Sequence, residues 1–318
     1  MTNSVSRISL DRILLASKLI DPVFLNSPQY LCEPLSAAVG VDVILKIETC
    51  NPIRSFKGRG ADFLLSQETS GRTMMCASAG NFGQAMAYAC RKQKRRLIVY
   101  AATKANTYKI ERMRSLGAEV ILHGEDFDAS KEEARRVAAE QGHMMIEDAL
   151  AIETVEGAGT IGLELTAIPD IDVLLISLGN GALFNGIATA FKALSPRTKR
   201  IAVQAAGAPA MAESWRKKEL VTYKQINTIA DGIGVRIPIQ QALVDLAPLA
   251  DDVITVKEDS ILQAMNLILS HAGVICEPSG AVGIAAILED KHRFSGLKVA
   301  TVICGGNLTE AQRTSWLK

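Results

Sequence analysis

The sequence predicts an α/β fold with two open, twisted, mostly parallel sheets flanked by helices. Short apolar runs recur along the chain, and helical patterns of ten or more residues separate most of them. This alternation is typical of right-handed βαβ crossovers, which build parallel sheets. The run Val173–Ser177 is almost continuously apolar, as a strand buried on both faces should be.

The expected strands and helices follow in chain order from these patterns. The apolar runs predict strands at Val41–Ile47, Thr73–Ala77, Leu97–Ala101, Glu119–Leu122, Met144–Ile146, Val173–Ser177, Arg200–Ala205, Val253–Val256 and Val299–Cys304. The helical patterns cover Asn81–Lys92, Asn106–Leu116, Asp126–Glu140, Ala151–Ala167, Ala182–Leu194 and Asp259–His271.

The length of the chain, 318 residues, indicates more than one domain core. The β–α units between about Thr73 and Asp148 are compact enough to form a sheet of their own. We therefore expect a small domain over residues 72–149 and a large domain built from residues 1–71 and 150–318. No repeat or Pro/Gly-rich linker marks this boundary, which is inferred from topology.

Composition and charge argue against several classes of protein. The net charge is +1, and the densest basic stretch, Arg91–Arg96, has no interleaved aromatics, so we expect a basic helix end and no nucleic-acid binding. No apolar run reaches membrane-spanning length and Met1–Leu10 has no apolar signal core, so we expect a cytoplasmic protein with no membrane partner. The six cysteines lack C-x-x-C pairs and metal-ligand spacing, which favours reduced thiols.

The loops after strands should carry the chemistry, because ligands bind beyond the carboxyl ends of strands in open parallel sheets. In the first of these loops, Lys57 follows Ser55, a plausible helix N-cap. Most lysines are solvated at the surface, and that is one interpretation of Lys57. The other is a lysine made nucleophilic by burial and by the positive helix end, able to form a Schiff base, with Phe56 as a flat wall beside it.

The second loop contains the small residues Ser78, Ala79 and Gly80 and opens the helix expected near Asn81. Small residues let backbone N–H groups approach a ligand, and the N-terminus of a helix carries a positive potential. This loop is therefore a candidate carboxylate or phosphate site. A tight turn capped by Asn81 explains the same residues, and both interpretations can hold together.

The third loop follows the buried strand and contains Gly179 and Gly181, whose backbone N–H groups suit a phosphate cradle. Dinucleotide-binding folds also use a G-x-G pattern, but they need an acidic residue about twenty residues further on to bind a ribose. Here the next expected strand ends in Gln204 and Ala205. A nicotinamide-dependent dehydrogenase is therefore disfavoured.

The fourth loop, Cys304–Asn307, follows the last expected strand. A thiol at the end of a buried strand could face a heteroaromatic nitrogen. Taken alone, the loop is more simply interpreted as a glycine turn.

Together the motifs S-F-K-G-R-G-A (55–61), S-A-G-N-F-G-Q (78–84), G-N-G-A-L (179–183) and C-G-G-N (304–307) resemble fold-type-II pyridoxal-phosphate (PLP) enzymes of the tryptophan synthase β-like superfamily. The segments T-I-A-D-G (228–232) and E-P-S-G-A (277–281) resemble the serine/threonine dehydratase branch. The resemblance spans roughly Leu31 to Thr309 and implies PLP in a cleft between a large and a small domain.

The resemblance also implies a role for each loop. Lys57 matches the Schiff-base lysine and catalytic base, Cys304 matches the neutral group that faces the pyridine nitrogen, and Glu277 matches an acidic residue near the ring. The positions that match cofactor-binding residues are Lys57, Phe56, Asn81, Gly179, Asn180, Gly181, Ala182, Leu183 and Cys304, and those that match the substrate-binding loop are Ser78, Ala79, Gly80 and Asn81.

The chain departs from the family pattern in three places. Asn180 and Ala182 replace two of the usual glycines of the phosphate loop, which need not abolish binding because backbone N–H groups do the work. Ala79 replaces the serine that acts as acid or base on the opposite face in serine racemase-like relatives. Gln204 stands where some relatives have a metal-binding glutamate, so no metal is expected there.

The reaction that the resemblance implies is that of an ammonia-lyase (dehydratase), which converts serine, threonine or a related β-hydroxy amino acid into a 2-oxo acid and ammonia. A β-replacement or threonine-synthase-like reaction is an alternative, although cysteine synthases carry T-S-G-N-T where this chain has S-A-G-N-F. A non-catalytic PLP-binding protein is a further alternative. We also expect a homodimer. Arg54, close to Lys57, could meet an anionic substrate group or be solvated.

Overall fold

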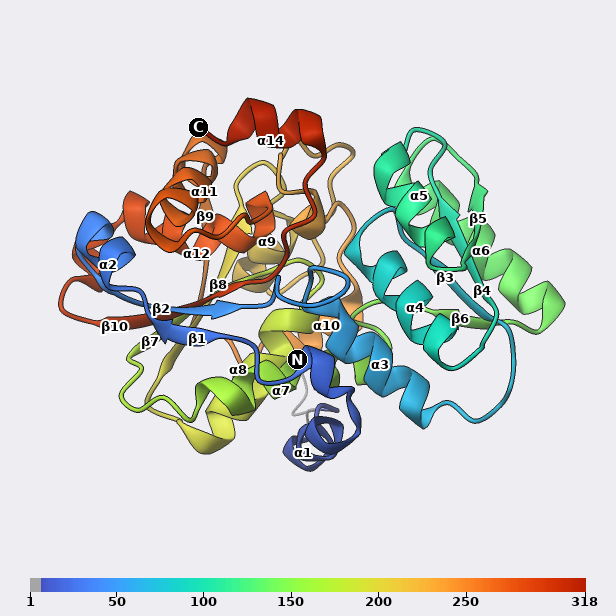
Figure 1. Ribbon diagram of the computed structural model, residues 1–318, viewed down its shortest axis with the longest axis horizontal. Helices are drawn as coiled ribbons and strands as arrows, with labels where there is room; N and C mark the ends of the chain where they lie inside the picture. The colour runs from blue at the N-terminus through green and yellow to red at the C-terminus, as the bar shows by residue number, and fades with distance from the viewer. Residues whose placement is uncertain (1–6) are drawn as a thin grey trace.

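The computed structural model describes residues 7–318, which form one six-stranded and one four-stranded sheet, each flanked by helices (Figure 1). Residues 1–6, which begin the expected large domain and the stretch expected to lack a signal core, lie outside the described residues. Among the strands of residues 7–318, only β1 pairs antiparallel with its neighbour, and the other strand pairs are parallel. The predicted fold class is confirmed.

The strands of the two sheets come from different parts of the chain. The larger sheet has the order β1 (Gln29–Leu31), β2 (Asp42–Ile47), β10 (Lys298–Ile303), β7 (Val173–Ser177), β8 (Lys199–Ala205) and β9 (Asp252–Val256). The smaller has the order β5 (Glu119–Leu122), β4 (Leu97–Ala101), β3 (Met74–Ala77) and β6 (Met144–Ile146). The first and last parts of the chain therefore share a sheet, as the sequence predicts.

The helices fill the connections between these strands. They are α1 (Leu10–Leu19), α2 (Glu33–Val39), α3 (Lys57–Gln67), α4 (Asn81–Lys92), α5 (Thr107–Ser115), α6 (Phe127–Gln141), α7 (Ile152–Leu165), α8 (Ala182–Leu194), α9 (Ala210–Lys217), α10 (Gln240–Leu246), α11 (Glu258–Ala272), α12 (Pro278–Glu289), α13 (Lys291–Phe294) and α14 (Glu310–Trp316), with 3₁₀ turns η1 (Pro22–Phe24) and η2 (Asp231–Ile233).

The larger sheet is covered on both faces. Helices α7 and α8 pack on one face and α11 and α12 on the other, as Figure 1 shows. In β7, Leu174 and Ile176 join the core beneath α7 and α8, whereas Val173 and Leu175 join the core beneath α11 and α12. Because the side chains from Val173 to Ile176 all pack beneath a helix layer, the strand is apolar up to Ser177, which lines the pocket described below.

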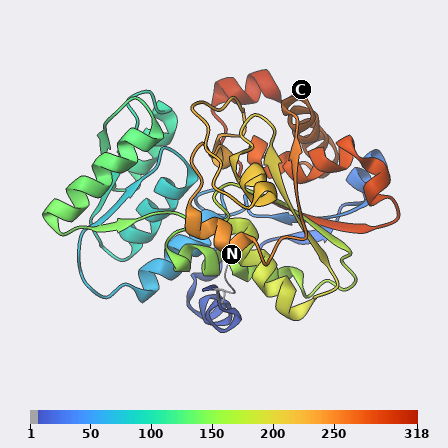
Figure 2. The same cartoon turned by 180° about the vertical axis from the view of Figure 1, so that it is seen from behind.

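The smaller sheet carries α4 and α5 on one face and α6 on the other, and Figure 2 shows α6 from behind. Helix α3 also joins this core, through Phe63 and Leu64, although residues up to 71 are expected in the large domain. On its other side α3 packs so closely on α7 that a Cβ on Gly60 would lie 2.6 Å from the carbonyl oxygen of Thr154. Helix α3 thus links the two sheets, and the predicted domain boundary stays a prediction.

Two further features of the fold concern membrane-spanning helices and the cysteines. Within residues 7–318, no helix is both long and apolar enough to cross a membrane. The six cysteines are free thiols, of which Cys50 is exposed and the others are buried.

Candidate functional site

A pocket of about 330 Å³ opens where the carboxyl ends of strands from both sheets converge. It brings together most of the residues that the sequence singles out, from the loops after β3, β7 and β10 and from the start of α3. The lining residues expected from the sequence are Phe56, Lys57, Ser78, Ala79, Gly80, Asn81, Gly179, Asn180, Gly181, Ala182, Leu183, Glu277 and Cys304.

Lys57 is the first residue of α3 and points its ammonium group into the pocket. Its Nζ forms an ion pair with Asp148 and lies 4.5 Å from the centroid of the Phe56 ring. The side chain is 16% exposed, so the solvated-lysine interpretation does not hold. The predicted cap is wrong by one residue, because Phe56 occupies the N-cap position; Ser55 Oγ nevertheless accepts a hydrogen bond from the backbone N–H of Lys57, at 3.3 Å.

The hydroxyl of Ser78 ties the loop before α4 to the first turn of that helix, because it accepts hydrogen bonds from the N–H groups of Gly80 (3.2 Å) and Gly83 (3.0 Å). Gly80 occupies the N-cap position and Asn81 is the first helical residue, so the predicted Asn81 cap is wrong. The Asn81 side chain instead donates to Glu277 Oε1 (2.7 Å) and accepts from Asn307 Nδ2 (2.8 Å). The first turn of α4 is left facing the pocket, where its N–H groups suit an anion.

The loop before α8 turns sharply at Gly181, whose φ of +93° lies in the left-handed region. A Cβ there would also lie 2.8 Å from Asn185 Nδ2, so this position requires glycine. Asn180 needs no glycine because its φ is not positive, and its Oδ1 accepts a hydrogen bond from the backbone N–H of Ile239, at 3.2 Å. The turn aims the N-terminus of α8 at the pocket, as a phosphate site requires.

The fourth loop contributes a buried thiol. Cys304 is 3% exposed and accepts a hydrogen bond from Ser177 Oγ, at 3.6 Å. Burial, followed by the nearby carboxylate of Glu277, raises the pKa of Cys304 to about 12. The thiol therefore keeps its proton at neutral pH and can donate it to an acceptor.

Glu277 is buried beside the thiol and interacts with both neighbouring loops. Its oxygens accept hydrogen bonds from Asn81 Nδ2 and from the backbone N–H of Asn307 (3.2 Å). Burial, and next the charge of Asp231, raises the pKa of Glu277 to about 7, against an ordinary value of 4.5. The carboxyl group thus titrates near neutrality.

We expect Glu277 to make the stability of the protein fall as pH rises. Because its folded-state pKa is raised, the proton binds the folded state more tightly, and the resulting stabilisation is complete below pH 4.5 and lost as pH rises through about 7. Between about pH 5 and pH 8 this group should lower the free energy of unfolding by about 2 kcal/mol. Denaturant unfolding of wild type and Glu277→Gln at both pH values measures this effect; equal pH dependence in the two proteins would contradict it.

The pocket residues to which the sequence analysis gives no role include Asp148, Lys109 and Ser279. Asp148 follows β6, so the rule that directs attention to loops after strands could have found it. Lys109 lies on α5 and forms an ion pair with Asp231 across the pocket (Nζ–Oδ2 2.5 Å). A local sequence pattern cannot predict this contact, because the two residues are far apart in the chain. Ser279 Oγ is buried and has no hydrogen-bond partner among residues 7–318.

Two other residues lie away from the pocket. Gln204 is fully buried, and its Oε1 accepts a hydrogen bond from the backbone N–H of Ala212, at 2.9 Å. In the described part of the chain no group of three His, Cys, Asp or Glu side chains could hold a metal ion; the absence of a metal stays a prediction. Arg54 is exposed and does not line the pocket, which favours its solvated interpretation.

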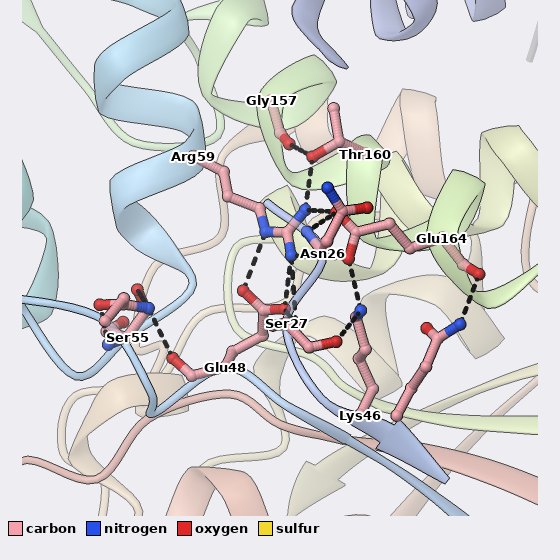
Figure 3. Close-up of polar contacts among 11 residues, drawn as sticks. Asn26, Ser27, Lys46, Glu48, Ser55, Arg59, Gly157, Thr160 and Glu164 are labelled. Atoms are coloured by element: carbon pink, nitrogen blue, oxygen red, sulfur yellow. Dashed lines mark hydrogen bonds and ion pairs between the residues drawn. The ribbon is translucent and has the colours of Figure 1, made fainter. Parts of the chain in front are cut away.

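A buried ion network supports the helix that carries Lys57 (Figure 3). Arg59, two residues further along α3, donates to Glu48 (2.9 and 2.8 Å) and to Glu164 (2.5 and 3.0 Å). Lys46 forms an ion pair with Glu164, and Thr160 Oγ1 accepts from Arg59 Nη1 at 3.0 Å. Burial alone would lower the pKa of Arg59, but the two glutamates hold it above its ordinary value. The network ties α3 to β2 and α7.

Comparison with known proteins agrees with this geometry. The family described as "Pyridoxal-phosphate dependent enzyme" matches residues 20–305. The L-threonine ammonia-lyase of Thermotoga maritima is 34% identical over 305 residues, which cover 95% of this chain and 76% of that protein.

Solved structures give the same grouping. The processed form of threonine deaminase isoform 2 from Solanum lycopersicum superimposes with a TM-score of 0.88 at 28% identity, covering 99% of this chain and 92% of that one. Maize serine racemase superimposes with a TM-score of 0.90 at 27% identity, covering 97% and 96%. The relatives thus include both ammonia-lyases and racemases.

Proposed function

Because the chain belongs to the family of pyridoxal-phosphate dependent enzymes, in the group of threonine dehydratases and serine racemases, we propose that it is an ammonia-lyase. Its substrate would be serine, threonine or a related β-hydroxy amino acid, and its products a 2-oxo acid and ammonia. The observation that carries the proposal is that Lys57 and Ala79, the second residue of the loop 78–81, line the same pocket. Racemisation needs a proton-carrying side chain on each face of the α-carbon, and Ala79, which matches the opposite-face serine of racemase-like relatives, cannot carry a proton.

The residues of the pocket fit PLP. The turn at Gly181 and the start of α8 offer backbone N–H groups for its phosphate. The neutral thiol of Cys304 and the unpartnered hydroxyl of Ser279 offer polar partners for its ring. Lys57 offers the amine that would hold its aldehyde carbon, beside the flat face of Phe56.

When bound, PLP supplies an aldehyde that takes up the substrate amine and a ring that withdraws electrons from the α-carbon. The N–H groups of Ser78, Gly80 and Gly83 already donate within the protein, so those of Ala79, Asn81 and Phe82 would hold the substrate carboxylate. Cys304, uncharged, would leave the ring nitrogen unprotonated, which tempers electron withdrawal and suits elimination.

The free amine of Lys57 would take the α-proton as general base. The resulting ammonium group lies beside the carboxylate of Asp148, which stabilises its charge. The same proton can return to the β-hydroxyl, which leaves as water. The enamine that is released then reacts with water to give the 2-oxo acid and ammonia.

The proposal is tested with a panel of amino acids offered to the purified holoenzyme. We expect 2-oxo acid and ammonia in equal amounts from L-serine, L-threonine or a close relative. O-acetylserine offered with sulfide serves as the comparison, because cysteine formation would identify β-replacement instead. Visible absorbance of the cofactor without turnover of any amino acid would leave only a binding function.

Racemisation should be slow beside elimination. The methyl group of Ala79 cannot exchange a proton. Asp148 contacts the Nζ of Lys57 itself, so Asp148 would serve the same face of the substrate as Lys57. Chiral chromatography of L-serine and L-threonine incubations, with 2-oxo acid followed in parallel, measures both reactions. We expect little D-amino acid from wild type and more from Ala79→Ser. D-serine formed as fast as 2-oxo acid by wild type would contradict the assignment.

A further inference from the structure

The pocket contains a carboxylate whose cationic partner is the catalytic lysine itself. Asp148 lies two residues beyond β6, the neighbour of β3, so its loop adjoins the substrate loop 78–81. One carboxylate oxygen, Oδ2, pairs with Lys57 Nζ. The other, Oδ1, is buried and has no hydrogen-bond partner within residues 7–318.

The other charged groups around the pocket already have partners of their own. Glu147, next to Asp148, accepts two hydrogen bonds from Arg135 (2.7 and 2.6 Å). Lys109 pairs with Asp231, and Lys131 pairs with Asp128 at 3.3 Å. None of these pairs depends on Lys57, so Asp148 is the carboxylate whose charge is uncovered when Lys57 changes partner.

Lys57 would cease to neutralise Asp148 both when it holds the cofactor and when it acts as the general base. An amine bound to the cofactor has lost most of its donor capacity, and an amine that is taking the α-proton cannot yet supply a positive charge. Asp148, whose side chain is 27% exposed, then faces the substrate with its buried oxygen Oδ1 unpartnered, and burying a polar atom without a hydrogen bond is costly. A substrate group with an O–H or N–H would satisfy it, and a second negative charge would add to the cost.

We propose that Asp148 selects substrates whose β-substituent donates a hydrogen bond or carries positive charge, and that it rejects anionic β-substituents such as carboxylate or phosphate. This inference rests on the proposed function, since it places the substrate beside Lys57. It narrows the substrate class to amino acids with a hydroxyl or ammonium group on the side chain.

The test measures binding rather than turnover, so it does not depend on the reaction catalysed. Three amino acids without a leaving group at Cβ are titrated into holoenzyme, and the visible absorbance of the cofactor reports the dissociation constant of each. They are 2,4-diaminobutyrate (cationic side chain), asparagine (neutral) and aspartate (anionic). Wild type should bind diaminobutyrate and asparagine at least about tenfold more tightly than aspartate.

Asp148→Asn keeps the shape of the side chain and removes its charge, and it should reduce this preference over aspartate by about tenfold. Glu147→Gln is the matched control: it removes a charge from the adjacent residue, and the preference should stay within about twofold because Arg135 already neutralises that carboxylate. An unchanged preference in Asp148→Asn would overturn the proposal.

If Asp148→Asn does not fold, the wild-type preference still decides: aspartate bound as tightly as asparagine would show that the lysines of the pocket, not Asp148, set its charge selectivity. Failure of the proposed function has a different signature, namely absence of 2-oxo acid from every amino acid while the binding preference persists.

Discussion

Lys57→Ala should lose more than about 10³-fold in turnover on the best substrate of the panel. The variant removes the amine that would hold the cofactor and the base that would take the α-proton, so no other pocket group compensates. It should still fold, because the Lys57 side chain lies in the pocket and takes no part in the buried network around Arg59. Steady-state assays at saturating cofactor, with circular dichroism to verify folding, measure both expectations.

Two further variants separate chemistry from charge. Lys57→Arg keeps a positive charge opposite Asp148, but a guanidinium group stays protonated and is no nucleophile, so it should be as inactive as the alanine variant. Lys104→Ala removes an exposed lysine (78% exposed) from the turn between β4 and α5 and should match wild type. Substantial turnover by Lys57→Arg would indicate that the charge of Lys57 matters and its amine does not.

Arg59→Ala should destabilise the protein by about 3–5 kcal/mol, because it leaves buried charges without their partner. Both Arg59 and Glu48 are fully buried, and Glu164 is 13% exposed. Lys46 would still neutralise Glu164, but no other cation contacts Glu48 in residues 7–318. Since Arg59 also fixes the helix that begins at Lys57, turnover should fall together with stability.

The matched control is an arginine in an exposed pair. Arg96 bonds Glu119 at 2.7 Å, but the two side chains are 61% and 49% exposed, so Arg96→Ala should cost no more than about 1 kcal/mol. Denaturant unfolding of the two variants beside wild type makes the comparison. Equal losses of stability in Arg59→Ala and Arg96→Ala would show that burial adds nothing to the network.

The strands and the pocket loops could be predicted because a strand buried on both faces is apolar in any context. The runs at 97–101 and 173–177 need no partner to be recognised, and the predicted and observed bounds of these strands agree. Strand β1 was beyond this reasoning, since its three residues are partly or largely exposed and depend on pairing with β2.

Helices α3 and α12 could not be predicted in full, because neither has a polar face. In α3 every residue from Gly58 to Leu65 is buried, Arg59 and Asp62 included, so the usual helical periodicity is missing. In α12 the same holds from Pro278 to Ile287. Both helices are buried by tertiary packing, which a local pattern does not encode.

The site shows the same division. Loops of small residues, such as Ser78–Gly80, identify the pocket from sequence alone. The role of Asp148 becomes apparent only from its contact with Lys57, which is 91 residues away in the chain. The predicted cap positions were wrong by one residue, because Phe56 and Gly80 occupy the N-cap positions of α3 and α4. The Asn81 side chain bonds Glu277 and Asn307 instead of capping its helix, whereas Ser55 still accepts the N–H of Lys57.

The central claim, that Lys57 holds the cofactor and performs the chemistry, is tested most directly by borohydride. Reduction of the holoenzyme should abolish its yellow colour and fix the cofactor to one lysine. Mass spectrometry of the digested protein should place the adduct on Lys57. An adduct on any other lysine would contradict the account.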